Sequence, residues 1–259
     1  MEYNWKILLI FLGTSLLLQA QSVSAKDEFI VVTELFDRFQ YIDQNDELTG
    51  YSVAVVNELI ALAGDQQLIE IYPWTVAFKK ALDQKNTMIF SIARTIDRED
   101  KFIWVGRLFH EPIYFWTLKK LNIPEVSNFE DLKSYTIAVV KDANSHDYLL
   151  RNDFPNIYVM ASTFSNNDSL TRMKMLNGHR ADMVIASEPD VVNAIKHIGL
   201  GRDALQKVYH DGHLNNDLYI AFNKESDVTL VSKYQKAFKS LEDSGRIKKL
   251  KQIWELEQD

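Results

Sequence analysis

The 259-residue chain contains no cysteine. This absence excludes disulfide bonds, a thiol nucleophile, a cysteine metal site and a lipid anchor on cysteine. Positive charge is not in excess either, because 36 Asp and Glu oppose 29 Lys and Arg, a formal net charge of −7. We therefore exclude nucleic acid and anionic lipid as expected partners. No nucleophile elbow, phosphate loop or zinc-protease helix is present, so the sequence predicts no metal, no cofactor and no enzyme.

Long hydrophobic runs are also scarce. Residues 7–18 form an apolar run that follows Lys6 and precedes the small residues Val23, Ser24 and Ala25. A run of about 12 residues is short for the roughly 20 that span a bilayer. We therefore expect residues 1–25 to be a signal peptide, cleaved after Ala25, that sends a soluble protein to the periplasm. The alternative is an uncleaved anchor.

The rest of the chain is globular in composition, with 46% hydrophobic and 25% charged residues. Apolar runs at residues 29–33, 69–72 and 88–92 predict strands, and helical periodicity between them predicts two helices, the first capped by Ser52. This β-α-β-α-β order is typical of a mostly parallel sheet covered by helices. A polar stretch with proline at residues 119–124 interrupts the pattern, and a second α/β run follows it.

One stretch in the first half predicts a binding site. The strand at residues 88–92 runs into a polar segment that carries Ser91, Arg94, Thr95 and Arg98. Open α/β sheets bind ligands beyond the carboxyl ends of their strands, and an arginine fork with nearby hydroxyls suits a carboxylate. The alternative is a solvated charged turn.

These residues, in this order, resemble the bacterial extracellular solute-binding proteins of family 3, the periplasmic amino-acid-binding components of ABC transporters. The resemblance covers the whole mature chain. Its strongest part is the segment from Ser91 to Phe102, and its supporting segments are residues 47–51, 72–74, 178–182, 218–222 and 245–254.

The resemblance implies an α/β protein with the two-lobed, type II periplasmic-binding-protein fold, in which two crossover strands join mixed sheets flanked by helices. It implies that residues 26–118 together with 221–259 form lobe 1 and that residues 119–220 form lobe 2. The ligand is then expected in the cleft between the lobes.

Site residues follow from the resemblance one at a time. Arg98 matches the arginine that clamps the ligand carboxylate, with Ser91 and Thr95 at the hydroxyl positions and Arg94 as a helper or a brace for the loop. The other expected ligand-binding residues are Phe36, Trp74, Asn144, Ser145, Glu34 and Glu188. Phe36 is equally typical of the lobe-1 core, Asn144 and Ser145 of helix capping, and Glu34 of a solvated strand end.

Two departures from the family pattern concern lobe 2. The acid that holds the ligand ammonium in relatives falls here on Ser187, so Glu34 or the neighbouring Glu188 is the candidate cation partner. The family's glycine before the lobe-2 helix is replaced by Asp142.

The expected function is therefore capture of a small carboxylate-bearing solute, such as an amino acid, by a monomer that presents it to a membrane ABC permease. Two alternatives stay open. One is a ligand-sensing subunit that docks on a membrane receptor, and the other is a dehydratase-like enzyme on the same fold, for which Glu34 and Glu188 are the candidate acid or base residues.

Overall fold

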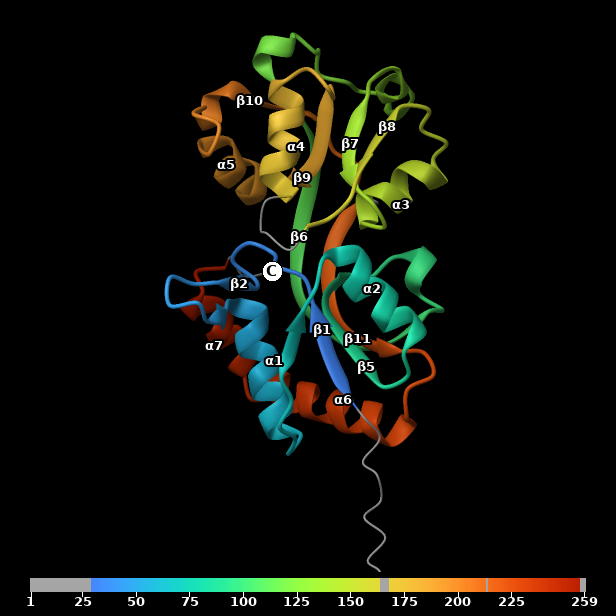
Figure 1. Ribbon diagram of the computed structural model, residues 1–259, viewed down its shortest axis with the longest axis vertical. Helices are drawn as coiled ribbons and strands as arrows, with labels where there is room; N and C mark the ends of the chain where they lie inside the picture. Colours follow the sequence, from blue (N-terminus) through green and yellow to red (C-terminus); the bar gives the residue numbers. More distant parts are fainter. Residues whose placement is uncertain (1–28, 164–167, 213, 257–259) are drawn as a thin grey trace, which may run out of the picture.

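A computed structural model describes residues 29–163, 168–212 and 214–256. The predicted signal peptide, residues 1–25, lies outside the described residues. Figure 1 shows two lobes stacked along the long axis of the molecule, with the strands β6 and β11 running between them. The α/β architecture with mixed sheets and covering helices confirms the predicted fold class.

Lobe 1 is built from two distant parts of the chain. Its elements are β1 (Ile30–Thr33), β2 (Tyr41–Ile42), β3 (Leu48–Thr49), α1 (Tyr51–Leu62), β4 (Ile69–Ile71), α2 (Trp74–Asp83), β5 (Thr87–Ala93), α6 (Val228–Asp243) and α7 (Arg246–Ile253). The strands β4, β1 and β5 are parallel neighbours, and β5 pairs antiparallel with β11 (Asn215–Asn223).

Lobe 2 repeats this plan with the middle of the chain. Its elements are β7 (Ile137–Val140), α3 (Asn144–Arg151), β8 (Ile157–Met160), α4 (Asp168–Asn177), β9 (Met183–Ser187), α5 (Glu188–Lys196) and β10 (Leu205–Tyr209). Short 3₁₀ helices lie at Ile96–Arg98, Lys119–Leu121, Phe129–Ser134 and Arg202–Ala204. The strands β8, β7 and β9 are parallel neighbours.

The strand β6 (Phe102–Leu118) belongs to both lobes. Residues up to Pro112 pair with β11, whereas Ile113 to Leu118 pair with β9 and β10 in the lobe-2 sheet. The sheet pairing thus changes near Pro112, whose missing N–H cannot donate to a ladder. The lobe boundaries at residues 118 and 220 stay predictions.

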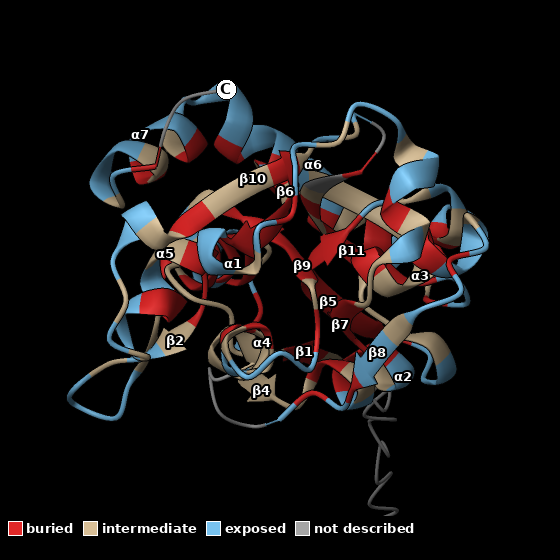
Figure 2. Ribbon diagram, turned by 90° about the horizontal axis from the view of Figure 1, so that it is seen from above, coloured by how far each residue is buried: buried red, intermediate tan, exposed pale blue. Residues whose placement is uncertain are grey.

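Buried strands form the centre of the molecule, and the helices expose their outer faces (Figure 2). The largest apolar cluster joins α1 and the lobe-1 sheet to the C-terminal helices, so α6 and α7 pack on lobe 1. Within that cluster the rings of Phe29, Phe222 and Tyr234 pack in tilted and edge-to-face arrangements, with centroids 5.2–5.6 Å apart.

The expectation that Ser52 caps the first helix is wrong. The helix α1 begins after Gly50, which has φ 124°, and no side chain caps it. A Cβ on Gly50 would lie 2.4 Å from the carbonyl oxygen of Phe39, so only glycine fits this turn. Ser52 is instead fully buried, and its hydroxyl lies 2.9 Å from the hydroxyl of Ser91.

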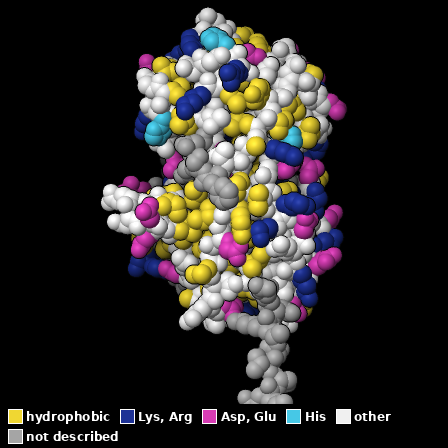
Figure 3. All heavy atoms as spheres, viewed as in Figure 1, with side chains coloured by type: hydrophobic (Ala, Val, Ile, Leu, Met, Phe, Trp, Pro, Cys, Tyr) yellow, Lys and Arg dark blue, Asp and Glu magenta, His cyan; other side chains and the backbone are white. Residues whose placement is uncertain are grey.

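The surface carries no large field of one sign on the face drawn in Figure 3. Acidic and basic side chains are intermixed there over the lower lobe, with apolar side chains between them. No helix in the described part of the chain is both long enough and apolar enough to cross a membrane.

Candidate functional site

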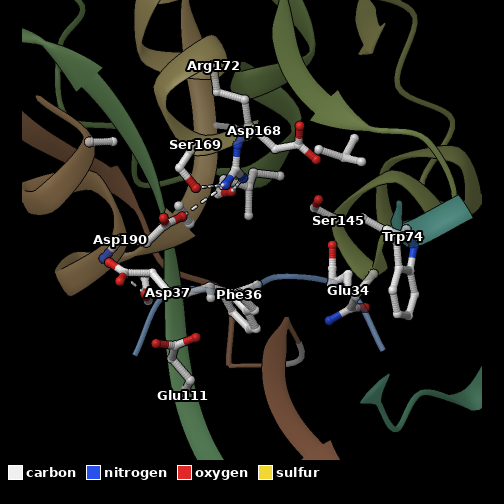
Figure 4. Close-up of a pocket in the computed structure, with 18 of the residues that line it drawn as sticks. Glu34, Phe36, Asp37, Trp74, Glu111, Ser145, Asp168, Ser169, Arg172 and Asp190 are labelled. Carbon is white, nitrogen blue, oxygen red and sulfur yellow. Dashed lines mark hydrogen bonds and ion pairs between the residues drawn. The ribbon is translucent and has the colours of Figure 1, made fainter. Parts of the chain in front are cut away.

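A cavity of about 320 Å³ lies between the lobes. This volume is at the lower end of the range of small-molecule sites, roughly 300–1,000 Å³. Figure 4 shows its charged side chains arriving from both lobes and from the β6 strand. The charged residues that line it are Glu34, Asp37, Arg98, Glu111, Asp168, Arg172 and Asp190.

Arg98 lies at one end of the cavity, in the 3₁₀ turn that follows β5. Its side chain is 1% exposed, and its guanidinium lies over the rings of Trp74 and Phe78, 5.3 and 4.8 Å from their centroids. Nη2 donates to the carbonyl oxygen of Asp142 at 2.8 Å and to the carboxylate of Asp147 at 3.0 Å. Nε is buried and has no hydrogen-bond partner in the described structure.

The contacts of Arg98 cross from lobe 1 to lobe 2, and others accompany them. The indole Nε1 of Trp74 donates to the same Asp142 carbonyl at 2.8 Å, and its backbone N–H donates to the hydroxyl of Ser162 at 2.6 Å. On the opposite side of the cavity, the Asn193 amide donates to the Asp37 carboxylate at 2.6 Å. Hydrogen bonds between the lobes therefore lie on both sides of the cavity.

Glu34 follows β1 and lines the cavity near Trp74 and Ser145 (Figure 4). Burial, together with a smaller effect of the nearby Asp168, raises the pKa of its carboxyl to about 8, although Arg172 and Arg98 act in the opposite direction. At neutral pH Glu34 is thus mostly protonated in this arrangement, and it is a hydrogen-bond donor as well as an acceptor.

Arg172 on α4 is the second arginine of the cavity. Nη1 donates to the carbonyl oxygen of Ile185 at 2.7 Å, and Nη2 donates to Ser169 and to the Asp190 carboxylate, each at 2.9 Å (Figure 4). Like Arg98, it keeps a buried Nε without a hydrogen-bond partner in the described structure. Asp168 lies near it, and burial raises the pKa of that carboxyl.

The far end of the cavity is acidic. Asp37, Glu111 and Asp190 lie on this side in Figure 4. Glu111 comes from β6, is 3% exposed and accepts a hydrogen bond from Nη2 of Arg38 at 2.7 Å. Burial raises the pKa of its carboxyl, although Arg38 acts against this shift.

Most residues predicted from the sequence line this one cavity. They are Glu34, Phe36, Trp74, Ser91, Arg98, Asn144 and Ser145. The Ser91 hydroxyl is engaged by its neighbours, since it donates to Gln40 and lies beside Ser52. Phe36 fits both of its interpretations, because it lines the cavity and packs on Phe39 at 5.1 Å between ring centroids. Neither Asn144 nor Ser145 caps α3, whose N-cap is Ala143.

Three predicted residues do not line the cavity. Arg94 braces its loop through Glu99, with Nε 2.8 Å from the carboxylate, and lies over Trp104 and Tyr219. The hydroxyl of Thr95 is buried without a partner in the described structure. Glu188 begins α5 and pairs with Lys207 and Arg202, outside the cavity.

Sequence reasoning missed Asp37, Glu111, Asp168, Arg172 and Asp190. Asp190 and Arg172 follow no motif, because they meet only when α4 packs on α5. Glu111 was detectable in principle, since it lies just before the apolar run at residues 113–118 and a carboxylate buried in a strand needs a partner. No group of three or more metal-binding side chains occurs among the residues described.

A two-lobed α/β fold with a charged, ligand-sized cavity between the lobes defines a solute-binding protein. The family model of the bacterial extracellular solute-binding proteins, family 3, matches residues 29–257, and the chain belongs to this family. The predicted family is therefore confirmed, and with it the function of binding a solute. The family and the relative described below are binding proteins rather than enzymes.

Known proteins support this placement. The chain is 25% identical over 230 residues to the L-cystine-binding protein TcyJ of Bacillus subtilis (strain 168), covering 85% of this chain and 80% of that protein. A histidine kinase sensor domain with similarity to periplasmic binding proteins shares the fold at a TM-score of 0.73 and 16% identity, over 88% of this chain and 96% of the other. The arginine-, lysine-, histidine-binding protein ArtJ of Geobacillus stearothermophilus shares the fold at a TM-score of 0.68 and 20% identity. The match covers 88% of this chain and 95% of the other.

Proposed function

We propose that this protein captures an amino-acid-class solute, bearing both carboxylate and ammonium groups, between its lobes and presents it to a membrane ABC permease. The observation that carries the proposal is the cavity itself, lined by two arginines and five carboxylates from both lobes. Groups of both signs line the cavity, so a ligand that carries both charges can match them, whereas a charge buried without a match is costly.

The carboxylate of the solute is assigned to the Arg98 end. Nε of Arg98 is a buried donor without a partner in the described structure, and Asn144 and Ser145 open α3 on the facing lobe. The N-terminus of a helix favours an anion through its free N–H groups and its dipole. Trp74 and Phe36 supply apolar walls for the rest of the solute.

L-Cystine is the first solute to test. The curated relative TcyJ is an L-cystine-binding protein. The cavity also has a second arginine, Arg172, paired with Asp190 away from Arg98. A solute with a zwitterionic head at each end matches two arginines that are each accompanied by carboxylates.

A set of three disulfides separates the contributions of the charges. L-Cystine carries both charges at each end, cystamine keeps only the ammonium groups, and 3,3′-dithiodipropionate keeps only the carboxylates. A ligand that binds the folded state alone raises the melting temperature with its concentration. We expect the largest shift with L-cystine. If L-cystine and the twenty standard amino acids all leave the melting temperature unchanged, the proposed function is wrong.

Arg98→Ala tests the carboxylate clamp. We expect L-cystine and dithiodipropionate to bind at least about 100-fold more weakly in calorimetry, since charge-assisted bonds are the strong ones. Cystamine should change far less. The matched variant Arg94→Ala, in the same loop but outside the cavity, should keep its affinity, and Arg98→Lys tests the fork at constant charge. Circular dichroism checks that each variant is folded. Unchanged L-cystine affinity in folded Arg98→Ala would refute the clamp.

Export and assembly belong to the same proposal. We expect cleavage after Ala25, a periplasmic location and a monomer, to be checked by N-terminal sequencing of the exported protein and by light scattering. The sensing and dehydratase alternatives stay predictions. A neighbouring permease gene or receptor gene separates transport from sensing, and chromatography after incubation with solute detects any turnover.

A further inference from the structure

Glu111 is an unusual group to find on a strand that joins two lobes. It lies on β6 one residue before Pro112, where the sheet pairing passes from lobe 1 to lobe 2. Its Oε1 accepts the hydrogen bond from Arg38, but its Oε2 is buried and has no hydrogen-bond partner at normal geometry in the described structure. A buried carboxylate oxygen without a donor is costly, which calls for a function.

The surroundings of Glu111 favour a cation. Asp190 is close enough to raise the pKa of the Glu111 carboxyl, and Asp37 lies on the same side of the cavity (Figure 4). Arg38 and Arg172 pair with Glu111 and Asp190 respectively. Three carboxylates against two guanidiniums leave this end one negative charge in excess when all are ionised.

The local chemistry narrows the kind of cation. The described residues offer no group of three or more metal-binding side chains, so a metal ion is not indicated. A primary ammonium is compact and has three N–H donors, which can divide between two carboxylates. The Ser187 hydroxyl, at the end of β9, accepts the backbone N–H of Asp190 at 3.4 Å and lies close enough to Glu111 to lower the pKa of its carboxyl by hydrogen bonding.

We propose that this end of the cavity binds an ammonium group of the solute between Glu111 and Asp190, so that the strand joining the lobes is itself part of the binding site. This assignment rests on the proposed function. Glu111 on β6 and Asp190 on α5 then bind the ammonium group. The predicted cation partner Glu188 pairs with Lys207 and Arg202 instead.

The test compares Glu111→Gln with wild type against the three disulfides by calorimetry. Glutamine keeps the shape and an acceptor for Arg38 but removes the charge. We expect affinity for L-cystine and cystamine to fall at least tenfold and affinity for dithiodipropionate to change less than twofold. Asp190→Asn should also weaken L-cystine and cystamine, whereas dithiodipropionate should bind equally well or more tightly because Arg172 is released; this variant serves if Glu111→Gln does not fold. Glu130→Gln, at a side chain 66% exposed in lobe 2, is the matched control.

The outcomes separate this inference from the proposed function. If wild type binds none of the three disulfides and no amino acid, the proposed function fails first. If wild type binds L-cystine but both variants keep its affinity within twofold, the ammonium site is refuted while the binding function stands. An equal loss for dithiodipropionate also refutes it, because that probe has no ammonium group.

Discussion

Replacing Glu34 by glutamine should change how the stability of the protein depends on pH. Burial raises the pKa of this carboxyl in the folded state to about 8 from the ordinary value of 4.5. Between these values the folded state keeps the proton and the unfolded state releases it. The stability contributed by Glu34 is therefore complete below pH 4.5 and is lost as the pH rises through 8. Glu34→Gln has no proton to lose.

The size of the effect follows from the shift. A difference of 3.5 units (8 minus 4.5) corresponds to an upper bound of about 5 kcal/mol, at 1.36 kcal/mol per unit. Relaxation and water penetration around the ionised carboxylate reduce the loss below this bound. We expect Glu34→Gln to gain about 2 kcal/mol relative to wild type between pH 5 and pH 9.

Urea unfolding of the ligand-free proteins at each pH unit from 5 to 9 measures this difference. Groups that titrate in both proteins, including Glu111, cancel in the comparison to first order. Asp168→Asn should move the midpoint of the wild-type change to lower pH, because Asp168 raises the pKa of Glu34. Parallel stability curves for wild type and Glu34→Gln would refute the reasoning.

Two further changes test the packing and the charge balance. Asp147→Asn removes the carboxylate that pairs with Arg98 at 3.0 Å and so competes with the solute carboxylate for this arginine. We expect L-cystine to bind up to about tenfold more tightly in calorimetry. Weaker binding would contradict this competition. Gly106→Ala should lower the free energy of unfolding by about 1–3 kcal/mol in urea, since a Cβ there would lie 2.0 Å from Cε1 of the buried Phe238. Gly212→Ala, with no atom within 4 Å of its Cβ, is the control, and equal stability of the two variants would contradict the packing argument.

Local and repeated signals predicted the α/β pattern, whereas the two-lobed arrangement followed from the family resemblance. Strand runs such as residues 29–33 are visible in a short window. The strand β10 escaped notice because Leu205 and Val208 alone do not make a pattern. Glu188 was predicted because it neighbours Ser187 at the position of the family's acid, but in the structure it pairs with Lys207 on β10.

The sequence predicted individual site residues in several segments, but not which side chains pair with one another. Arg94 and Arg98 stand four residues apart, and sequence alone gave Arg94 two possible roles; in the structure it braces the loop through Glu99. By contrast, Glu111 and Asp190 come from distant segments that meet only in the folded molecule. Their proximity depends on the pairing of β6 with β9, where Ile113 lies opposite Ser187.

The carbonyl oxygen of Asp142 receives donors from both Arg98 and Trp74. Because the acceptor belongs to the backbone, no substitution at position 142 removes it, provided that the new residue tolerates φ 59°. Glycine adopts that conformation freely, so Asp142→Gly should leave the link intact. The acceptor on lobe 2 thus tolerates side-chain substitution at position 142. The contact is lost only if Arg98 or Trp74 is replaced or if the backbone around residue 142 changes its conformation.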